Sequence, residues 1–194
     1  MDKTKHPPKR RLNHRFRFQL LHQWLTEKYL PCKVADVGGG KGLLAYLLSQ
    51  SGWDVTVIDP LDLPLPPRFK DLNKNRTKLK PEERVFSKKM LEPFEEEMAK
   101  DFDLLIGMHA HGSNMKIINA CKKYGKDFLL LPCCVIDEPI VKRPGVNWIN
   151  SLIEYAKKQG FEVKTERLNF VGQSLIVYSD TNLKRLLLTL SFPT

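Results

Sequence analysis

The sequence has few cysteines, no long apolar run and no apolar segment behind its basic start. Four cysteines in 194 residues, unevenly spaced, are too few for a disulfide scaffold, so we expect a reducing compartment. No stretch of roughly 18 apolar residues is present, which excludes a membrane-spanning helix. The N-terminal segment also lacks the apolar core of a secretory signal. We therefore expect a cytoplasmic protein with no membrane partner.

Acidic residues are outnumbered by basic ones. The chain has 32 Lys and Arg against 22 Asp and Glu, a formal net charge of +10 and a pI near 9.5. Such an excess favours encounter with a polyanion, and RNA is the leading candidate partner. A generally basic, solvated surface is the alternative. Composition leaves the oligomeric state and the need for a protein partner subunit open.

Predicted strands and helices alternate along the chain, as in an α/β fold with a parallel sheet. Two last strand-like runs, 161–167 and 173–178, have no room for a helix between them and must pair as an antiparallel hairpin. We expect residues 1–31 to form a basic arm and an N-terminal helix, and residues 32–194 to form one globular domain. The earlier strands are predicted at 33–37, 54–59, 84–88, 103–107 and 127–131, and a helix that carries Glu95, Glu96 and Glu97 is expected up to Lys100.

Basic residues concentrate in the arm and in the segment 60–81, which is too long and polar for a tight connection and is a plausible substrate or lid loop. Such groups would bind phosphates without recognising a base sequence. Phe16 and Phe18 would stack on bases or pack against the sheet. The predicted RNA-binding residues are Arg15, Arg17, Lys74, Arg76 and Lys78, within the wider basic sets Lys9, Arg10, Arg11, Arg15, Arg17 and Arg68, Lys70, Lys74, Arg76, Lys78, Lys80.

A glycine loop follows the first predicted strand in the run Asp36-Val-Gly38-Gly-Gly40-Lys-Gly42. Glycines between a strand and a helix let backbone N–H groups approach a ligand that a Cβ would block. A dinucleotide fingerprint would need glycine or alanine at position 43, which is Leu43. Asp59 ends the next strand, where an acid accepts hydrogen bonds from ribose hydroxyls. The alternatives are a helix-capping role for Asp36 and a turn role for Asp59.

The spacing of Asp36 and these glycines resembles motif I of the class I S-adenosylmethionine-dependent methyltransferases. The resemblance implies a doubly wound, mostly parallel, seven-stranded Rossmann-like sheet with a C-terminal antiparallel hairpin, and S-adenosylmethionine as the cofactor. Adenine contacts by Leu61, Met90 or Leu91 are possible by position, with plain packing as the alternative. The residues expected to hold the cofactor are Asp36, Gly38, Gly39, Gly40, Gly42, Asp59 and Met108.

Two short motifs at later strand ends, Met108-His109-Ala-His111-Gly112 and Pro132-Cys133-Cys134, resemble the methyltransferase domain of the Trm13-type tRNA 2′-O-methyltransferases. The resemblance covers roughly residues 34–138. His111 stands where that family's pattern has cysteine. The resemblance implies an RNA acceptor, tRNA or rRNA, methylated on a ribose 2′-oxygen or on a base.

The catalytic candidates are His109, His111 and Cys133. His109 would accept a proton from a hydroxyl or orient its oxygen, or it would merely pack or cap a helix. Cys133 and Cys134 would supply a nucleophile, as in RNA cytosine-5 methyltransferases, join both histidines in a zinc site, or shape the pocket floor. The missing C-x-x-C spacing leads us to expect no metal.

These features together predict an enzyme that transfers a methyl group from S-adenosylmethionine to RNA. A protein or small-molecule methyltransferase is one alternative. A non-catalytic, methyltransferase-like RNA-binding subunit is the other.

Overall fold

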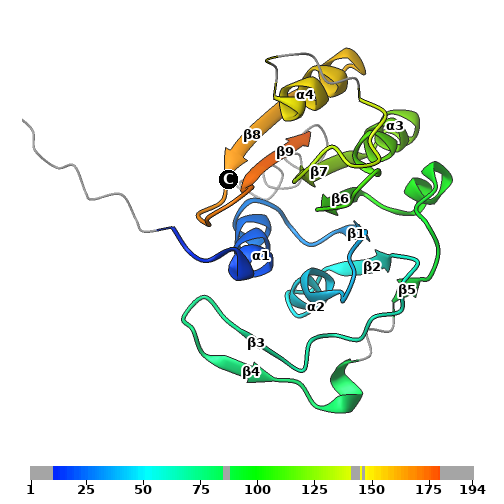
Figure 1. The fold of residues 1–194 in the computed structure, drawn as a ribbon. Helices are drawn as coiled ribbons and strands as arrows, with labels where there is room; N and C mark the ends of the chain where they lie inside the picture. The colour runs from blue at the N-terminus through cyan, green and yellow to red at the C-terminus, as the bar shows by residue number, and fades with distance from the viewer. Residues whose placement is uncertain (1–10, 85–87, 141–144, 146, 180–194) are drawn as a thin grey trace, which may run out of the picture.

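A seven-stranded sheet in the order β5-β2-β1-β6-β7-β9-β8 organises the structure (Figure 1). The computed structural model describes residues 11–84, 88–140, 145 and 147–179. Strands β5, β2, β1, β6 and β7 are parallel, and β9 runs antiparallel to both of its neighbours. The doubly wound, mostly parallel fold with a C-terminal antiparallel hairpin is thereby confirmed. The strands are β1 (Lys33–Val37), β2 (Asp54–Ile58), β5 (Lys89–Met90), β6 (Leu104–Met108), β7 (Asp127–Leu131), β8 (Val163–Arg167) and β9 (Leu175–Ser179).

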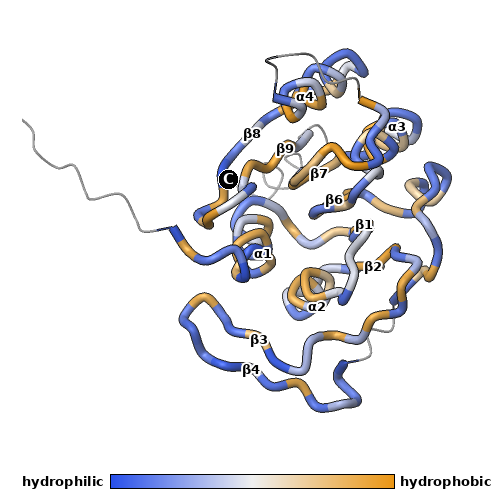
Figure 2. The backbone as a smooth tube through the Cα atoms, in the orientation of Figure 1, coloured by the Kyte–Doolittle hydropathy of each residue, from blue (hydrophilic) through white to orange (hydrophobic). Residues whose placement is uncertain are grey.

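The central strands form because both of their faces are covered, so that β6 and β7 are buried along their whole length. Side chains alternate between two cores. Leu104 and Ile106 pack with α1 and α2, whereas Leu105 packs with α3 and α4. The apolar sides of the helices face the sheet in Figure 2. The helices are α1 (Arg17–Lys28), α2 (Leu43–Ser49), α3 (Asn114–Tyr124) and α4 (Trp148–Lys158).

The segment 60–81 contains a β-hairpin rather than the plain loop expected from its length. Strands β3 (Arg68–Lys70) and β4 (Arg76–Lys78) pair antiparallel. The Asp71 carboxylate closes the turn by accepting the backbone N–H of Asn75 at 2.8 Å, and Lys74 adopts a φ of 67° there. Strands of three residues are too short to show a hydrophobic period, which is why the sequence pattern missed them.

Two further predictions were wrong in position or type. The third parallel strand is β5 at Lys89–Met90 instead of 84–88, because only its two residues pair with β2. Pro81–Arg84 forms the 3-10 helix η2, and residues 85–87 lie outside the described residues. The helix expected through residues 95–100 is the 3-10 helix η3 (Glu96–Asp101).

The N-terminal helix is part of the main core. A 3-10 turn, η1 (His14–Phe16), leads into α1, and Leu12 forms a bridge with Phe170 near the far end of the chain. Leu21 and Leu25 of α1 are fully buried. The domain boundary at residue 31 stays a prediction, and the arm residues Lys9 and Arg10 lie outside the described residues. Within the described part of the chain, every helix is too short or too polar to cross a membrane.

Truncation of Leu25 tests whether α1 is integral to the fold. We expect Leu25→Ala to lower the free energy of unfolding by about 2–5 kcal/mol, the usual cost of a fully buried leucine. The exposed Glu27 on the same helix is the control, and Glu27→Ala should change stability by about 0.5 kcal/mol or less. Urea unfolding measures both. Equal, small effects would mean that α1 is a detachable arm.

Candidate active site

The carboxyl ends of β1, β2 and β6 meet at one edge of the sheet, and Asp59 joins two of the loops there. Its Oδ2 accepts the backbone N–H of Gly40 at 2.9 Å, and its Oδ1 accepts that of Leu61 at 2.9 Å. The N–H of Gly38 bonds to the carbonyl of Ile58 at 2.8 Å. Asp59 is therefore a turn acid that also holds the glycine loop. A carboxylate has lone pairs left for a ligand after two such bonds.

The glycine loop wraps closely around Asp36. Gly38, Gly40 and Gly42 have φ values of 65°, 54° and 74°, a region that side chains other than glycine rarely adopt. A Cβ on Gly39 would lie 2.6 Å from Asp36 Oδ2. These positions require glycine because the backbone must both turn and lie against the acid.

Asp36 is a buried acid with one unsatisfied oxygen. Its side chain is 2% exposed, and Oδ2 has no hydrogen-bond partner. Burial raises the pKa of Asp36 to about 7; the backbone N–H of Ala45 lowers it, and the charge of Asp59 raises it further. Because an unpaired buried carboxylate is costly, this oxygen is suited to a cationic or hydrogen-bond-donating ligand.

Two cavities flank the glycine loop. The larger, about 830 Å³, lies between this loop, α1 and the β3–β4 hairpin. The smaller, about 380 Å³, lies between Asp59 and the loop that follows β6. Gly38 and His109 line both cavities, so the two spaces meet at these residues.

Most of the predicted cofactor residues gather at these cavities. Asp59 lines the smaller one, and Gly42 lines neither. The suggested adenine contacts Leu61, Met90 and Leu91 also line neither cavity. The larger cavity is lined by the predicted residues Asp36, Gly38, Gly39, Gly40 and Met108.

Pro93 and Phe94 line the smaller cavity opposite Asp59 and were missed from the sequence. The misplaced third strand explains the omission, since the segment that follows the true β5 begins two residues later than expected. Knowing that Lys89–Met90 is the strand would have directed attention to the residues just after it.

Cationic side chains line the larger cavity: five come from η1, α1 and the β3–β4 hairpin across from the glycine loop, and one comes from that loop. Of the predicted RNA-binding residues, Arg15, Arg17 and Arg76 are there, whereas Lys74 and Lys78 are exposed on the hairpin outside it. Sequence reasoning missed Lys41. Among the described residues, none of the cavity's cations forms an ion pair with a carboxylate. The complete set is Arg15, Arg17, Lys41, Arg68, Lys70 and Arg76.

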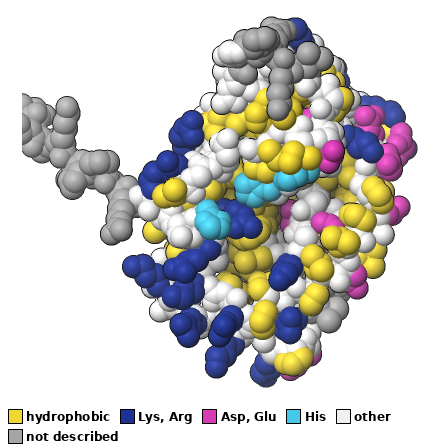
Figure 3. Space-filling model, viewed as in Figure 1, with side chains coloured by type: hydrophobic (Ala, Val, Ile, Leu, Met, Phe, Trp, Pro, Cys, Tyr) yellow, Lys and Arg dark blue, Asp and Glu magenta, His cyan; other side chains and the backbone are white. Residues whose placement is uncertain are grey.

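The hairpin and α1 enclose this cavity through specific contacts. The Gln19 side chain donates to the Lys70 carbonyl at 2.6 Å, and Phe69 meets Tyr46 of α2 edge to face at 6.1 Å. Phe16 is buried, and Phe18 is partly buried beneath the Arg17 guanidinium at 4.2 Å. Figure 3 shows the resulting hollow, with Lys and Arg side chains around its lower left side and histidines along its upper rim.

His109 lies where the two cavities meet, in a left-handed conformation with a φ of 58°. Its Nδ1 is buried and has no partner. Burial lowers the pKa of His109 to about 4, and the nearby charges of Arg17, His111 and His14 lower it further. The imidazole is thus neutral near pH 7. With so low a pKa it is a weak base, so it is better suited to orienting an acceptor group than to removing a proton from that group.

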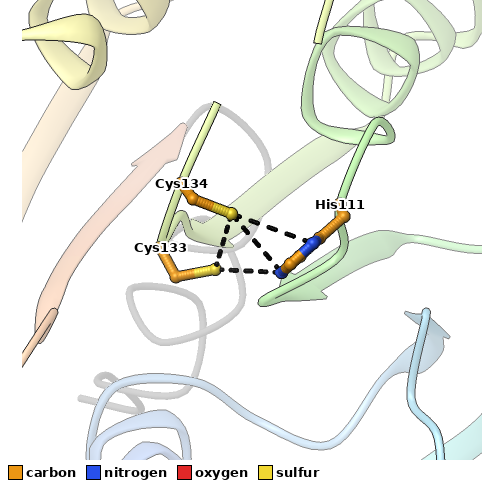
Figure 4. Close-up of side chains that lie close together, drawn as sticks. All are labelled: His111, Cys133 and Cys134. Carbon is orange, nitrogen blue, oxygen red and sulfur yellow. Dashed lines mark hydrogen bonds between the residues drawn. The ribbon is translucent and has the colours of Figure 1, made fainter. Parts of the chain in front are cut away.

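His111, Cys133 and Cys134 converge from the loops after β6 and β7 (Figure 4). His111 Nε2 lies 3.3 Å from Cys133 Sγ and 3.5 Å from Cys134 Sγ. His109 is not part of this group. Burial, followed by the hydrogen bond with Cys134, raises the pKa of Cys133 to about 11. A neutral thiol disfavours the nucleophile interpretation.

Comparison with known proteins finds similarity in structure alone. No protein-family model matches the chain, and no curated protein matches it in sequence. The S-adenosylmethionine-dependent methyltransferase SibL, in its apo form, superposes with a TM-score of 0.50 at 13% identity, over 86% of this chain and 55% of that one. TnmH gives a TM-score of 0.50 at 11% identity, over 87% and 55%.

Precorrin-6y C5,15-methyltransferase from Geobacter metallireducens GS-15 superposes with a TM-score of 0.48 at 11% identity, over 84% of this chain and 87% of that one. The chain thus spans about half the length of SibL and TnmH. At these identities the likeness shows the fold. The chain has the Rossmann-like fold of the class I methyltransferases, as the sheet order indicates.

Replacing Asp36 tests how much the burial of its charged carboxyl costs in folding free energy. Because folding raises this pKa from 3.8 to about 7, the contribution of Asp36 to the free energy of unfolding is most favourable below about pH 4 and is lost as the pH rises through 7. Asp36→Asn removes that loss. We therefore expect the free energy of unfolding of the variant to exceed that of the wild type by up to roughly 4 kcal/mol at pH 8 and by less at pH 5. Urea unfolding at both pH values measures the difference. The exposed Asp101→Asn is the control, and a gap for Asp36→Asn that does not vary with pH would contradict the assignment.

Proposed function

We propose that this protein transfers a methyl group from S-adenosylmethionine to RNA. One observation carries the proposal: a single cavity has the unpartnered Asp36 carboxyl beside the glycine loop on one wall and unpaired cations on the other. The first wall suits the cationic methionyl end of the cofactor. The second suits an anionic acceptor.

The residues present fit this cofactor. Asp36 lines the larger cavity and has an oxygen without a partner, so it would attract the ammonium group of the cofactor, and the lack of a Cβ on Gly39 lets the loop lie against that carboxyl. Asp59 borders the smaller cavity, where it would accept from the ribose hydroxyls, and Phe94 lies there to contact the adenine. Bound S-adenosylmethionine supplies an electrophilic methyl group on a sulfonium whose leaving group is neutral.

The chain's own contribution is then alignment of the acceptor. His109 lines both cavities, where its imidazole would contact an acceptor hydroxyl or amino group. Burial lowers the pKa of His109, and the charge of the nearby Arg17 lowers it further, so the imidazole is neutral near pH 7. Fixing the acceptor oxygen or nitrogen in line with the methyl group supplies most of what the reaction needs.

RNA is the acceptor that the cavity wall favours. Arg15 and Arg76 are exposed at its mouth, and Lys74 and Lys78 extend the positive surface along the hairpin. Unpaired cations in such an arrangement bind phosphates. The motifs that resemble the Trm13-type enzymes support a more specific form of the proposal, in which tRNA is methylated on a ribose 2′-oxygen.

A small anionic molecule is the second candidate acceptor. The enclosed cavity of about 830 Å³ is within the range of small-ligand pockets. Leu63, Pro66 and Phe69 give it an apolar wall beside the cations. This combination would also hold a compact molecule that carries a carboxylate or phosphate.

Labelled methyl transfer tests the proposal. The protein is incubated with labelled S-adenosylmethionine and with RNA, DNA, protein and small-molecule fractions from cells that lack it. We expect label in RNA, and a loss of cofactor affinity of about 10- to 100-fold with Asp59→Ala, since hydrogen bonds to a charged group contribute about 1.5–3 kcal/mol. Asp62→Ala, an exposed acid three residues further on, is the control and should retain activity.

Nucleoside digestion of the labelled RNA then distinguishes ribose from base methylation. Label only in the small-molecule fraction would favour the second candidate, and label only in protein would replace RNA with a protein acceptor. Cofactor binding without transfer to any fraction would point to a missing partner subunit. Absence of cofactor binding would refute the methyltransferase proposal and favour a non-catalytic role.

The salt dependence of RNA binding tests the cation wall. We expect the double variant Arg15→Ala/Arg76→Ala to reduce the magnitude of the slope of log affinity against log salt by about 1–2. With fewer phosphate contacts, fewer counterions are released when RNA binds. Lys157→Ala/Lys158→Ala removes the same charge from α4, which does not line the cavity, and should leave the slope nearly unchanged. An identical loss for both double variants would indicate a diffuse effect of net charge.

A further inference from the structure

The three side chains at the ends of β6 and β7 are spaced like the donors of a tetrahedral metal ion. His111 Nε2 lies 3.3 Å from Cys133 Sγ and 3.5 Å from Cys134 Sγ, and the two sulfurs are 3.5 Å apart. Zinc bonds of about 2.3 Å to sulfur and about 2.0 Å to nitrogen place tetrahedral ligands about 3.8 Å apart for two sulfurs and about 3.5 Å for sulfur and nitrogen. The observed triangle is within a few tenths of an ångström of one tetrahedral face.

The two loops that carry these donors are held together by other residues. Both carboxylate oxygens of Glu138, in the loop after β7, accept backbone N–H groups at the start of α3, from Asn114 at 2.8 Å and Met115 at 3.2 Å. A Cβ on Gly112 would lie 3.0 Å from the Cβ of Asp137, so the loops are in close contact next to His111. The donors are therefore positioned by the fold before any ion binds.

A disulfide does not account for the pair of cysteines. Their sulfurs are 3.5 Å apart, well beyond the roughly 2.05 Å of a disulfide bond, and both thiols are free. A purely packing role does not account for them either, because His111 is exposed and its ring nitrogens are directed at both sulfurs (Figure 4).

We propose that His111, Cys133 and Cys134 bind one zinc-class metal ion, with a fourth coordination position open to water or to an acceptor atom. Two thiolates and an imidazole are the ligand types that zinc and related borderline-soft ions prefer. Within the part of the chain that the structure describes, the group contains three ligands and no fourth. Three protein ligands with one open position are typical of reactive rather than structural zinc sites.

Metal binding here exchanges protons for the ion. Each of the two thiols loses its proton to solvent as its sulfur bonds to the dication, so two protons leave for each ion bound. The two thiolates then balance the charge of the ion, and the imidazole ligand is neutral. Affinity must therefore rise with pH. The site does not depend on methyl transfer, and its test uses the protein alone.

Cobalt(II) is the probe for the test. The reduced full-length protein, freed of metal, is titrated with Co²⁺, and we expect one equivalent to produce the intense visible bands of tetrahedral cobalt together with thiolate-to-cobalt charge transfer. Zn²⁺ should then displace it and bleach both signals. Azide should shift the visible bands if the fourth position is open.

The variants Cys133→Ser, Cys134→Ser and His111→Ala should each weaken Co²⁺ binding by at least about 10-fold, as loss of a metal ligand does. Cys32→Ser, which replaces a half-buried cysteine at the start of β1, should bind as the wild type does. Circular dichroism and urea unfolding show that each variant is folded.

Three results would overturn the inference. The first is wild-type protein without thiolate-to-cobalt charge transfer. The second is charge transfer that persists at full strength in Cys133→Ser and Cys134→Ser. The third is azide insensitivity, which would show a closed site. Absence of S-adenosylmethionine binding together with an intact cobalt spectrum would leave the metal site established and refute the proposed function only.

Discussion

The carboxylate of Asp59 joins the two strand-end loops on which the candidate site depends. It accepts one backbone N–H from the glycine loop and one from the turn after β2. This arrangement places the loop over Asp36 and leaves both cavities open at Gly38. Two parallel strands that pair side by side are required for it, because only then do their carboxyl ends meet.

The site that results is electrostatically unsatisfied. A buried acid lacks a partner for one oxygen, and several cations across the cavity lack carboxylate partners in the described part of the chain. Such a site costs stability, as groups prepared for a ligand commonly do. The two apolar cores on either side of the sheet offset this cost by burying β1, β6 and β7.

The same parallel arrangement brings reactive side chains from distant parts of the sequence to the carboxyl edge of the sheet. The loop after β6 carries His109 and His111, and the loop after β7 carries Cys133 and Cys134. Because these strands are neighbours, the histidines and cysteines of the two motifs meet. The two histidines nevertheless differ in their contacts: His109 lines both cavities, whereas His111 lines only the smaller one and lies against the two cysteines.

Sequence alone determined the alternation of strands and helices, the reversed last strand, and the positions of Asp36, the glycine loop and Asp59, since these depend on local periodicity and turn chemistry. Tertiary structure decided which cations face the cavity, the β3–β4 hairpin, the place of Phe94, and the grouping of His111 with both cysteines without His109. Those features depend on which loops pack together. Contacts between residues far apart in the chain leave no periodic pattern in the sequence from which they could be predicted.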